Sequence, residues 1–206
     1  MTQVLPKKLS PAARDDLRRH FCALEANDRR LRFGSMISDA GIDNYVAHID
    51  FDRDAVFGVY GAELQLAGVA HVAVGGGVAE LGVSVLPGHR GRGIGSALFD
   101  RAGMFARNHL LKTLFMHCLT ENQAMMHIAK KSNMRIVAES GEADAHLELP
   151  PSDPSSIARE MFQEQVALFD YTLRSQVLSA RRIGEAVMQQ PAAVEEDEQR
   201  GSPEIR

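Results

Sequence analysis

One stretch of the 206-residue chain constrains its fold more than any other, because a strand, a glycine-rich loop and a helix follow one another directly. Residues 79–86 form a Val-rich apolar run typical of a strand, and residues 94–110 place apolar side chains at helical spacing. Between them, Gly91, Gly93 and Gly95 let several backbone N–H groups point into one concavity, and the helix adds free N–H groups and the positive end of its dipole. This arrangement predicts a phosphate-binding turn.

The spacing within this turn distinguishes among phosphate-binding classes. Arg90 and Arg92 supply positive charge for a pyrophosphate or a 3′-phosphate. A P-loop requires Lys before its Ser or Thr, whereas Ser96 follows Gly95, so the sequence excludes a P-loop. The Gly-x-Gly-x-Gly spacing after expected antiparallel strands also argues against a dinucleotide-binding βαβ unit and a nucleotide-binding regulatory domain.

The remaining patterns predict a mixed α/β (α+β) chain. Apolar runs separated by glycine turns indicate an antiparallel meander of three strands, with further strands and helices after it. We expect strands at residues 3–9, 55–60, 64–74, 79–86, 113–119, 135–139 and 145–149, and helices at 11–26, 36–48, 94–110, 122–132 and 157–188. Residues 1–150 are therefore assigned to one domain, 151–190 to a C-terminal helical extension, and 191–206 to an acidic tail that we expect to be disordered.

Charge and cysteine content exclude several classes of protein. The net charge is −4, and the last twelve residues, with five acids and two arginines, contribute −3 of it, so the rest is close to neutral. Without a broad basic field, we expect no nucleic-acid partner. Cys22 and Cys118 lie far apart without a Cys/His zinc spacing, and no run of about 18 apolar residues occurs. We therefore expect no metal, no membrane span and a cytoplasmic location.

Two motifs resemble those of a known family. The pattern Arg90-x-x-Gly93-x-Gly95, between a strand and a helix, is similar to the acyl-CoA-binding signature (Gln/Arg)-x-x-Gly-x-(Gly/Ala) of the GCN5-related N-acetyltransferases (GNAT). Residues 121–134 resemble the family's second motif, in which an Asn, here Asn122, begins a helix beside the CoA arm. The resemblance covers roughly residues 5–149. Residues 31–38 and Glu80 also resemble the branch that includes bacterial protein-lysine acetyltransferases.

The resemblance implies a GNAT-type, mostly antiparallel sheet flanked by helices, with acetyl-CoA held where two adjacent parallel strands, residues 79–86 and 113–119, splay apart. The pantetheine would lie along the first strand, on the backbone groups around Val83 and Val85. An amine would attack the thioester directly, with an amide N–H stabilising the oxyanion. The implied CoA-binding residues are Val83, Val85, Arg90, Gly91, Arg92, Gly93, Ile94, Gly95, Ser96 and Asn122.

The reaction needs a base, because an alkyl amine with a pKa of about 10.4 is mostly protonated at neutral pH. Glu80 is the candidate, ten residues before Arg90, where many family members carry a catalytic Glu. Strand alternation puts Glu80, Gly82 and Ser84 on one face, and the small side chains leave space for a substrate. Alternatively, Glu80 only occupies the exposed start of a strand. The family's usual acid, a Tyr seven residues after the Asn, is replaced by Ala129.

The sequence therefore predicts an N-acetyltransferase that moves an acetyl group from acetyl-CoA to a primary amine, in a small molecule or a protein lysine. A non-catalytic acyl-CoA-binding regulatory module is the alternative, which Ala129 favours and Glu80 opposes. His71, in the middle of an apolar strand, is expected to be a hydrogen-bonded core histidine. The apolar stripe of the C-terminal helix requires a partner surface, for which we expect a homodimer.

Overall fold

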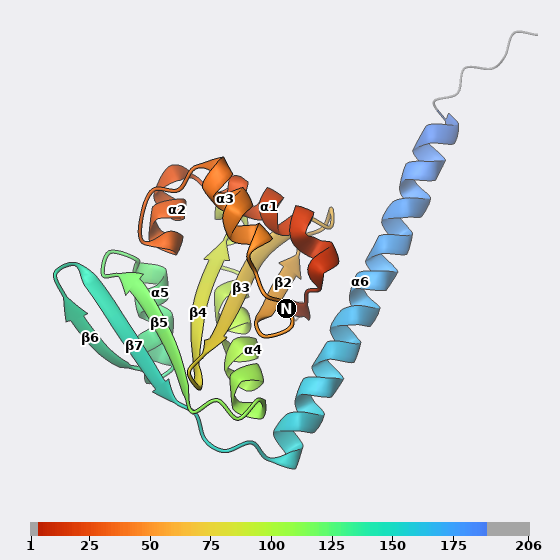
Figure 1. The fold of residues 1–206 in the computed structure, drawn as a ribbon. Helices are drawn as coiled ribbons and strands as arrows, with labels where there is room; N and C mark the ends of the chain where they lie inside the picture. The colour runs from red at the N-terminus through yellow and green to blue at the C-terminus, as the bar shows by residue number, and fades with distance from the viewer. Residues whose placement is uncertain (1–3, 189–206) are drawn as a thin grey trace, which may run out of the picture.

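The central element of the structure, a computed structural model that describes residues 4–188, is a seven-stranded sheet in the order β1-β2-β3-β4-β5-β7-β6 (Figure 1). All neighbouring strands are antiparallel except β4 and β5, which are parallel. The strands are β1 Lys7–Lys8, β2 Ala55–Tyr60, β3 Leu66–Gly75, β4 Val78–Val85, β5 Thr113–Leu119, β6 Arg135–Glu139 and β7 Glu142–Glu148. The predicted meander is β2-β3-β4, and the mixed, mostly antiparallel fold class is confirmed.

Helices cover both faces of this sheet, with α4 and α5 on one side and α1 to α3 on the other (Figure 1). They are α1 Arg14–Cys22, α2 Ala26–Phe33, α3 Asp39–Ala47, α4 Ile94–Asn108, α5 Gln123–Lys131 and α6 Pro154–Met188, with short 3-10 turns at Pro11–Ala13 and Pro87–His89. Alternation along the strands feeds two cores: Phe57 and Leu81 pack toward α4, whereas Val56 and Val69 pack beneath α1 and α3.

Helix α2 is absent from the sequence-based expectation, which had no helix between residues 26 and 36. Its eight residues include none that is buried, so no apolar periodicity indicates it. The helix is fixed by polar contacts: the Arg29 guanidinium donates to the Cys22 carbonyl at 2.7 Å and pairs with Asp39 at 2.6 Å. Gly34, at φ 74°, ends it in the left-handed conformation that favours glycine.

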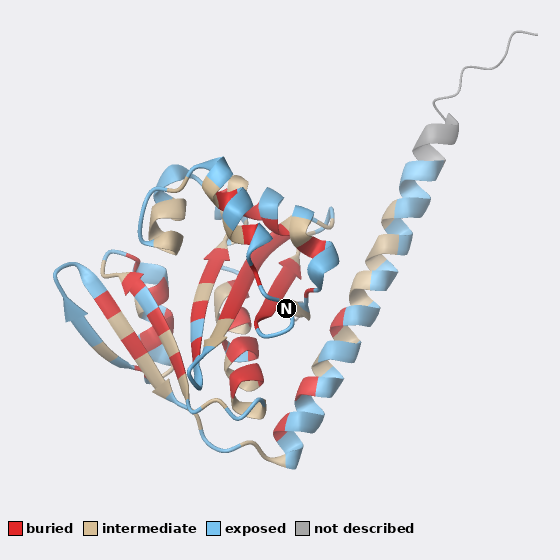
Figure 2. Ribbon diagram, viewed as in Figure 1, coloured by how far each residue is buried: buried red, intermediate tan, exposed pale blue. Residues whose placement is uncertain are grey.

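Helix α6 begins at Pro154, three residues earlier than expected, because the Asp153 carboxylate accepts a hydrogen bond from the Ser156 amide at 2.9 Å. Its early turns pack on α4 through Arg101, which is 2% exposed and pairs with Glu160 at 2.6 Å. Farther along, α6 extends beyond the domain, and much of its surface is exposed (Figure 2). Residues 189–190 of the expected extension and the acidic tail 191–206 lie outside the described residues.

Between residues 4 and 188, no helix has the length and apolar character needed to cross a membrane.

Candidate active site

Strands β4 and β5 separate soon after they begin. Their parallel pairing is limited to residues 78–80 of β4 against residues 113–115 of β5. Beyond this point β4 continues with β3 to Val85, while β5 continues with β7 to Leu119. The strands therefore splay apart, as the sequence resemblance implied, and one edge of β4 is left without a neighbouring strand.

The backbone of Val83 and Val85 faces this open edge. In the β3-β4 ladder, the Leu86 amide donates to the Ala67 carbonyl at 2.9 Å, which identifies even-numbered residues of β4 as those bonded to β3. Because successive residues of a strand direct their polar groups to opposite edges, the odd-numbered Val83 and Val85 present theirs to the gap. Consistent with this, the Val85 carbonyl accepts a hydrogen bond from Arg90 Nε at 3.2 Å.

A cavity of about 430 Å³ occupies the gap, bounded by β4, the glycine turn, the first residues of α4, helix α5 and one side of α2. Most of the predicted CoA-binding residues line it: Val83, Val85, Arg90, Gly91, Gly93, Ile94, Gly95, Ser96 and Asn122. Two predicted site residues do not. Arg92 is exposed outside the lining, and Glu80 lies deeper along β4, at the last position paired with β5.

The glycine turn has the geometry of an anion site. Gly91 and Gly93 have φ values of 73° and 78°, in the left-handed region where a side chain would be strained. Within the described chain, no acceptor is present for the amides of residues 91–96, whereas the Ala97 amide already donates to the Gly93 carbonyl at 3.0 Å. These free donors at the start of the 15-residue α4 fit a diphosphate.

Arg90 has an unexpected partner. Its guanidinium pairs with Asp28 of α2 at 2.6 Å, and the Asp28 side chain is only 12% exposed. This contact links the glycine turn to α2 beside the cavity, which both residues line. A phosphate at the turn would therefore share Arg90 with a carboxylate.

Asn122 acts as the cap of α5. Its Oδ1 accepts from the Met125 amide at 3.2 Å, and its Nδ2 donates to the Leu31 carbonyl of α2 at 3.4 Å. The cap fixes where α5 starts, and the second bond holds α2 beside the cavity.

Position 129 is fully buried as Ala in the core next to α4. The general acid found at this position in many family members is therefore missing, and the space around it is filled by packing. The role of Glu80 as base stays a prediction; its side chain is exposed on the face of β4 opposite α4.

On that face, Arg32 occupies the space that the sequence assigned to substrate. A Cβ added to Gly82 would lie 2.3 Å from Arg32 Cζ, so the guanidinium rests directly on the strand. The rings of Phe33, Tyr45 and Phe21 surround it, with centroids 4.8, 5.7 and 5.8 Å from Cζ.

A chain of hydrogen bonds continues from Arg32 and becomes buried at His71 and Asp54. Arg32 Nη2 donates to the Tyr45 hydroxyl at 2.9 Å, the hydroxyl lies 2.7 Å from His71 Nδ1, and His71 Nε2 lies 3.2 Å from Asp54 Oδ2. Because the Asp54 carboxylate only accepts, His71 carries its proton on Nε2, and Nδ1 of the neutral imidazole accepts from the Tyr45 hydroxyl. His71 is thus the hydrogen-bonded core histidine that was expected.

Burial decides the charges in this network. Desolvation and the nearby Arg32 guanidinium lower the pKa of His71, so its imidazole is neutral at pH 7. Burial raises the pKa of Asp54, but hydrogen bonds from Arg53, the Val74 amide and His71 outweigh it and hold this pKa below its ordinary value.

Ser84, which lines the cavity, is held by a second buried histidine. Its hydroxyl lies 2.8 Å from His20 Nε2, and His20 Nδ1 donates to the Leu66 carbonyl at 2.8 Å. Burial lowers the pKa of His20 to about 4. A neutral, weakly basic imidazole orients the Ser84 hydroxyl but is poorly suited to activate it as a nucleophile.

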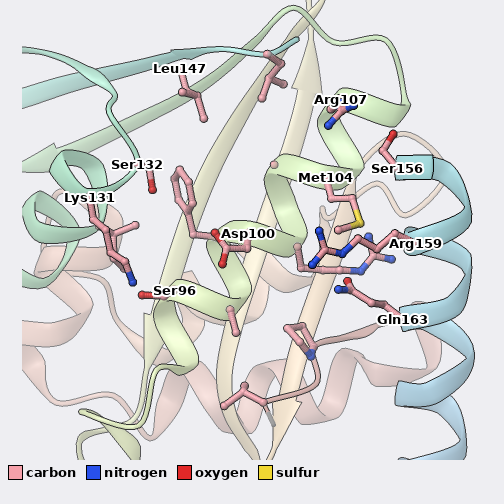
Figure 3. Close-up of a pocket in the computed structure, with 18 of the residues that line it drawn as sticks. Ser96, Asp100, Met104, Arg107, Lys131, Ser132, Leu147, Ser156, Arg159 and Gln163 are labelled. Carbon is pink, nitrogen blue, oxygen red and sulfur yellow. The ribbon is translucent and has the colours of Figure 1, made fainter. Parts of the chain in front are cut away.

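A larger cavity, about 680 Å³, lies on the other side of α4, between α4, α6 and the end of β7 (Figure 3). Arg159 and Gln163 reach from α6 toward Met104 of α4, and Lys131 comes from α5 (Figure 3). It meets the first cavity only through Ser96 and Ile128. It lacks the open strand edge and the glycine turn, so the smaller cavity is the candidate active site.

Within the described part of the chain, no group of three or more His, Cys, Asp or Glu residues is placed to hold a metal.

Sequence reasoning missed the contribution of α2, which supplies Asp28, Leu31 and Arg32 to the cavity, together with the preceding Leu24. A signal was present within the helix: Asp28, Leu31 and Arg32 are spaced i, i+3 and i+4, so a helix places them on one face. Two of the three are charged, and a search for an apolar stripe therefore did not find them.

A cleft with an open strand edge beside a phosphate-binding turn defines an acyl-CoA-dependent acyltransferase. The model of the family described as Acetyltransferase (GNAT) family matches residues 14–134, more than half of the chain. The chain belongs to the GNAT family, whose members transfer acyl groups from an acyl-CoA to amines.

Solved structures agree in fold. The GNAT domain of PAT from S. lividans is 17% identical, with a TM-score of 0.60 over 70% of this chain and 89% of that one. The spermidine/spermine N-acetyltransferase of Vibrio cholerae is 18% identical, with a TM-score of 0.52 over 71% and 94%. The ribosomal-protein-alanine N-acetyltransferase of Brucella melitensis is 15% identical, with a TM-score of 0.55 over 71% and 100%. No curated protein gave a significant match.

Proposed function

We propose that this protein transfers an acetyl group from acetyl-CoA to a primary amine by direct attack, with Glu80 as the base. The observation that carries the proposal is the cavity where β4 and β5 splay, with the open backbone of Val83 and Val85 on one side and the free amides of residues 91–96 on the other. The first suits a pantetheine amide chain, and the second suits the diphosphate of CoA.

In the proposed reaction, Glu80 accepts a proton from the substrate ammonium. The amine nitrogen then attacks the thioester carbon, the C–S bond breaks, the nitrogen releases its second proton to solvent, and CoA leaves as its thiolate. The amide N–H groups of β4 that face the gap stabilise the oxyanion. With Ala129 in the core, the thiolate leaves without help from a tyrosine at that position.

The variant Glu80→Gln tests this mechanism. It should bind CoA as tightly as the parent protein and lose turnover about 100- to 10,000-fold, since the base is removed and the cavity is not. Glu63→Gln, an exposed change outside the site, is the matched control. Calorimetry with CoA and a thiol-release assay supply the two readouts. Full turnover by Glu80→Gln would refute the role of Glu80.

A non-catalytic acyl-CoA-binding module is the second candidate, favoured by the buried Ala129 at the usual acid position. It predicts CoA binding without acetyl transfer to any member of an amine panel. The acceptor is a small-molecule amine or a protein lysine; the similar structures include a spermidine/spermine N-acetyltransferase and a ribosomal-protein-alanine N-acetyltransferase. The cytoplasmic location stays a prediction from the sequence.

The assembly proposed from the sequence is a homodimer through α6. Large apolar side chains on this helix are exposed, among them Met161, Phe162 and Phe169 at 65%, 70% and 71%. Sedimentation velocity should give twice the chain mass, and the double variant Phe162→Asp, Phe169→Asp should sediment as a monomer. A monomeric parent protein would refute the dimer.

A further inference from the structure

We propose that Arg32 binds a carboxylate of the acceptor, so that the substrate is an amino acid whose amine faces Glu80 and whose carboxylate faces Arg32. This inference rests on the proposed acetyl transfer and narrows its acceptor from any primary amine to a zwitterion. Four features of the site support it.

The first feature is position. The Arg32 guanidinium lines the cavity together with Val83 and Ser84. It lies on β4 so closely that a Cβ on Gly82 would be 2.3 to 2.6 Å from its Cζ and Nη atoms. A group bound to Arg32 is therefore next to the open strand edge where the thioester is expected.

The second feature is an unpaired charge. The other charged side chains of α2 have partners in the structure: Asp28 with Arg90, Arg29 with Asp39, and Arg30 with Glu121. Among residues 4–188, Arg32 has only the Tyr45 hydroxyl as an acceptor, and its buried Nε has none. A half-buried guanidinium with unused donors is suited to an anionic group from outside the chain.

The third feature is the neutral packing immediately around the guanidinium; in the described chain the nearby carboxylates of Asp28 and Glu80 are not bonded to it. Three aromatic rings enclose the guanidinium, and the imidazoles of His20 and His71 are neutral at pH 7, since burial lowers the pKa of both. Asp54 lies beyond His71 and is bonded to it, so it is not in contact with Arg32. The aromatic rings reduce the contact of the guanidinium with water on its packed side, which strengthens a charged hydrogen bond formed there.

The fourth feature is the opposite charge nearby. Glu80 is two residues from Gly82 on the same face of β4, which separates the two backbone positions by about 7 Å. An amine beside Glu80 and a carboxylate on Arg32 complement this pair of charges. A polyamine would instead bring further positive charge against the guanidinium, and a lysine side chain in a peptide would leave Arg32 unpaired.

The test uses matched substrates. Acetyl transfer is measured for free amino acids and for the same amino acids as their carboxamides, which keep the amine and lose the negative charge. The parent protein should prefer the acids by about 10- to 100-fold in kcat/KM, the range expected for a charge-assisted hydrogen bond. Arg32→Gln should reduce that ratio to near one. Arg18→Gln, which removes an arginine of a surface ion pair, should keep it.

Two further measurements keep the inference falsifiable. Gly82→Ala leaves Arg32 in the sequence but displaces its guanidinium, and should also reduce the preference. Calorimetry of the CoA complex with N-acetyl amino acids and their amides reports carboxylate binding without turnover. Equal use of acids and amides, or spermidine or a lysine peptide as the best acceptor, would overturn the carboxylate site. Selective binding of acids without transfer to any amine would support the site and refute the proposed reaction.

Discussion

The buried His20 makes the stability of this protein depend on pH above the range in which carboxylates titrate. His20 is 2% exposed, and burial lowers its pKa from 6.5 to about 4. Between these two values the unfolded chain binds a proton at this side chain and the folded chain does not. Its contribution to stability is therefore fully present above pH 6.5 and is lost as pH falls toward 4.

The size of the loss follows from the shift in pKa. Each pH unit across this window corresponds to about 1.4 kcal/mol for one proton, so His20 alone should remove about 2 kcal/mol between pH 6.5 and 5 and about 3 kcal/mol by pH 4. The lowered pKa of His71 adds a decrease of the same sign. Asp54 and Glu160, whose pKa values are also lowered, lose their contributions only as pH falls below their ordinary pKa values of 3.8 and 4.5.

Urea unfolding followed by circular dichroism from pH 7.5 to 4.5 measures this effect. The comparison is with His20→Gln, which removes the titrating group and should flatten the curve, whatever its stability at pH 7.5. His48→Gln changes an exposed histidine and should keep the parental slope. Parallel curves for the parent and His20→Gln would show that His20 does not bind its proton differently in the two states, and would refute the reasoning.

Two other contacts give predictions of known sign. In Gly68→Ala, the new Cβ would lie 2.6 Å from Ile94 Cγ2 in the first turn of α4. Urea unfolding should therefore show a loss of about 1–3 kcal/mol in the free energy of unfolding, and calorimetry should show weaker CoA binding. An unchanged unfolding midpoint would contradict the close packing. Glu160→Ala leaves the buried Arg101 without its main counter-ion and should lower the free energy of unfolding by about 3 kcal/mol. The apolar double variant Arg101→Met, Glu160→Leu should recover most of this loss. Equal stability of the two variants would contradict a buried ion pair.

The elements that the sequence predicted well are those specified by neighbouring residues. The strand, glycine turn and helix of residues 78–108 and the Asn122 cap depend on local φ values, on alternation and on a side chain reaching three residues along the chain. Strands β2, β5 and β6 match their predicted bounds because their apolar or β-branched runs end at turn residues. The conformation of the glycine turn therefore followed from the sequence, and the family followed from the resemblance of its motifs. Phosphate binding at this turn stays a prediction.

The acceptor side was decided only by tertiary structure. Arg32 meets Gly82, Asp28 meets Arg90, and His20 meets Ser84 across 50 to 64 residues of chain. The network from Tyr45 through His71 to Asp54 likewise joins a helix, a strand and a loop. Contacts of this kind leave no period in the sequence, since each depends on how helices dock on the sheet. Local preferences produced the turn where we propose that CoA binds, and the docking of α2 placed Arg32 in the cavity where we propose that the acceptor binds.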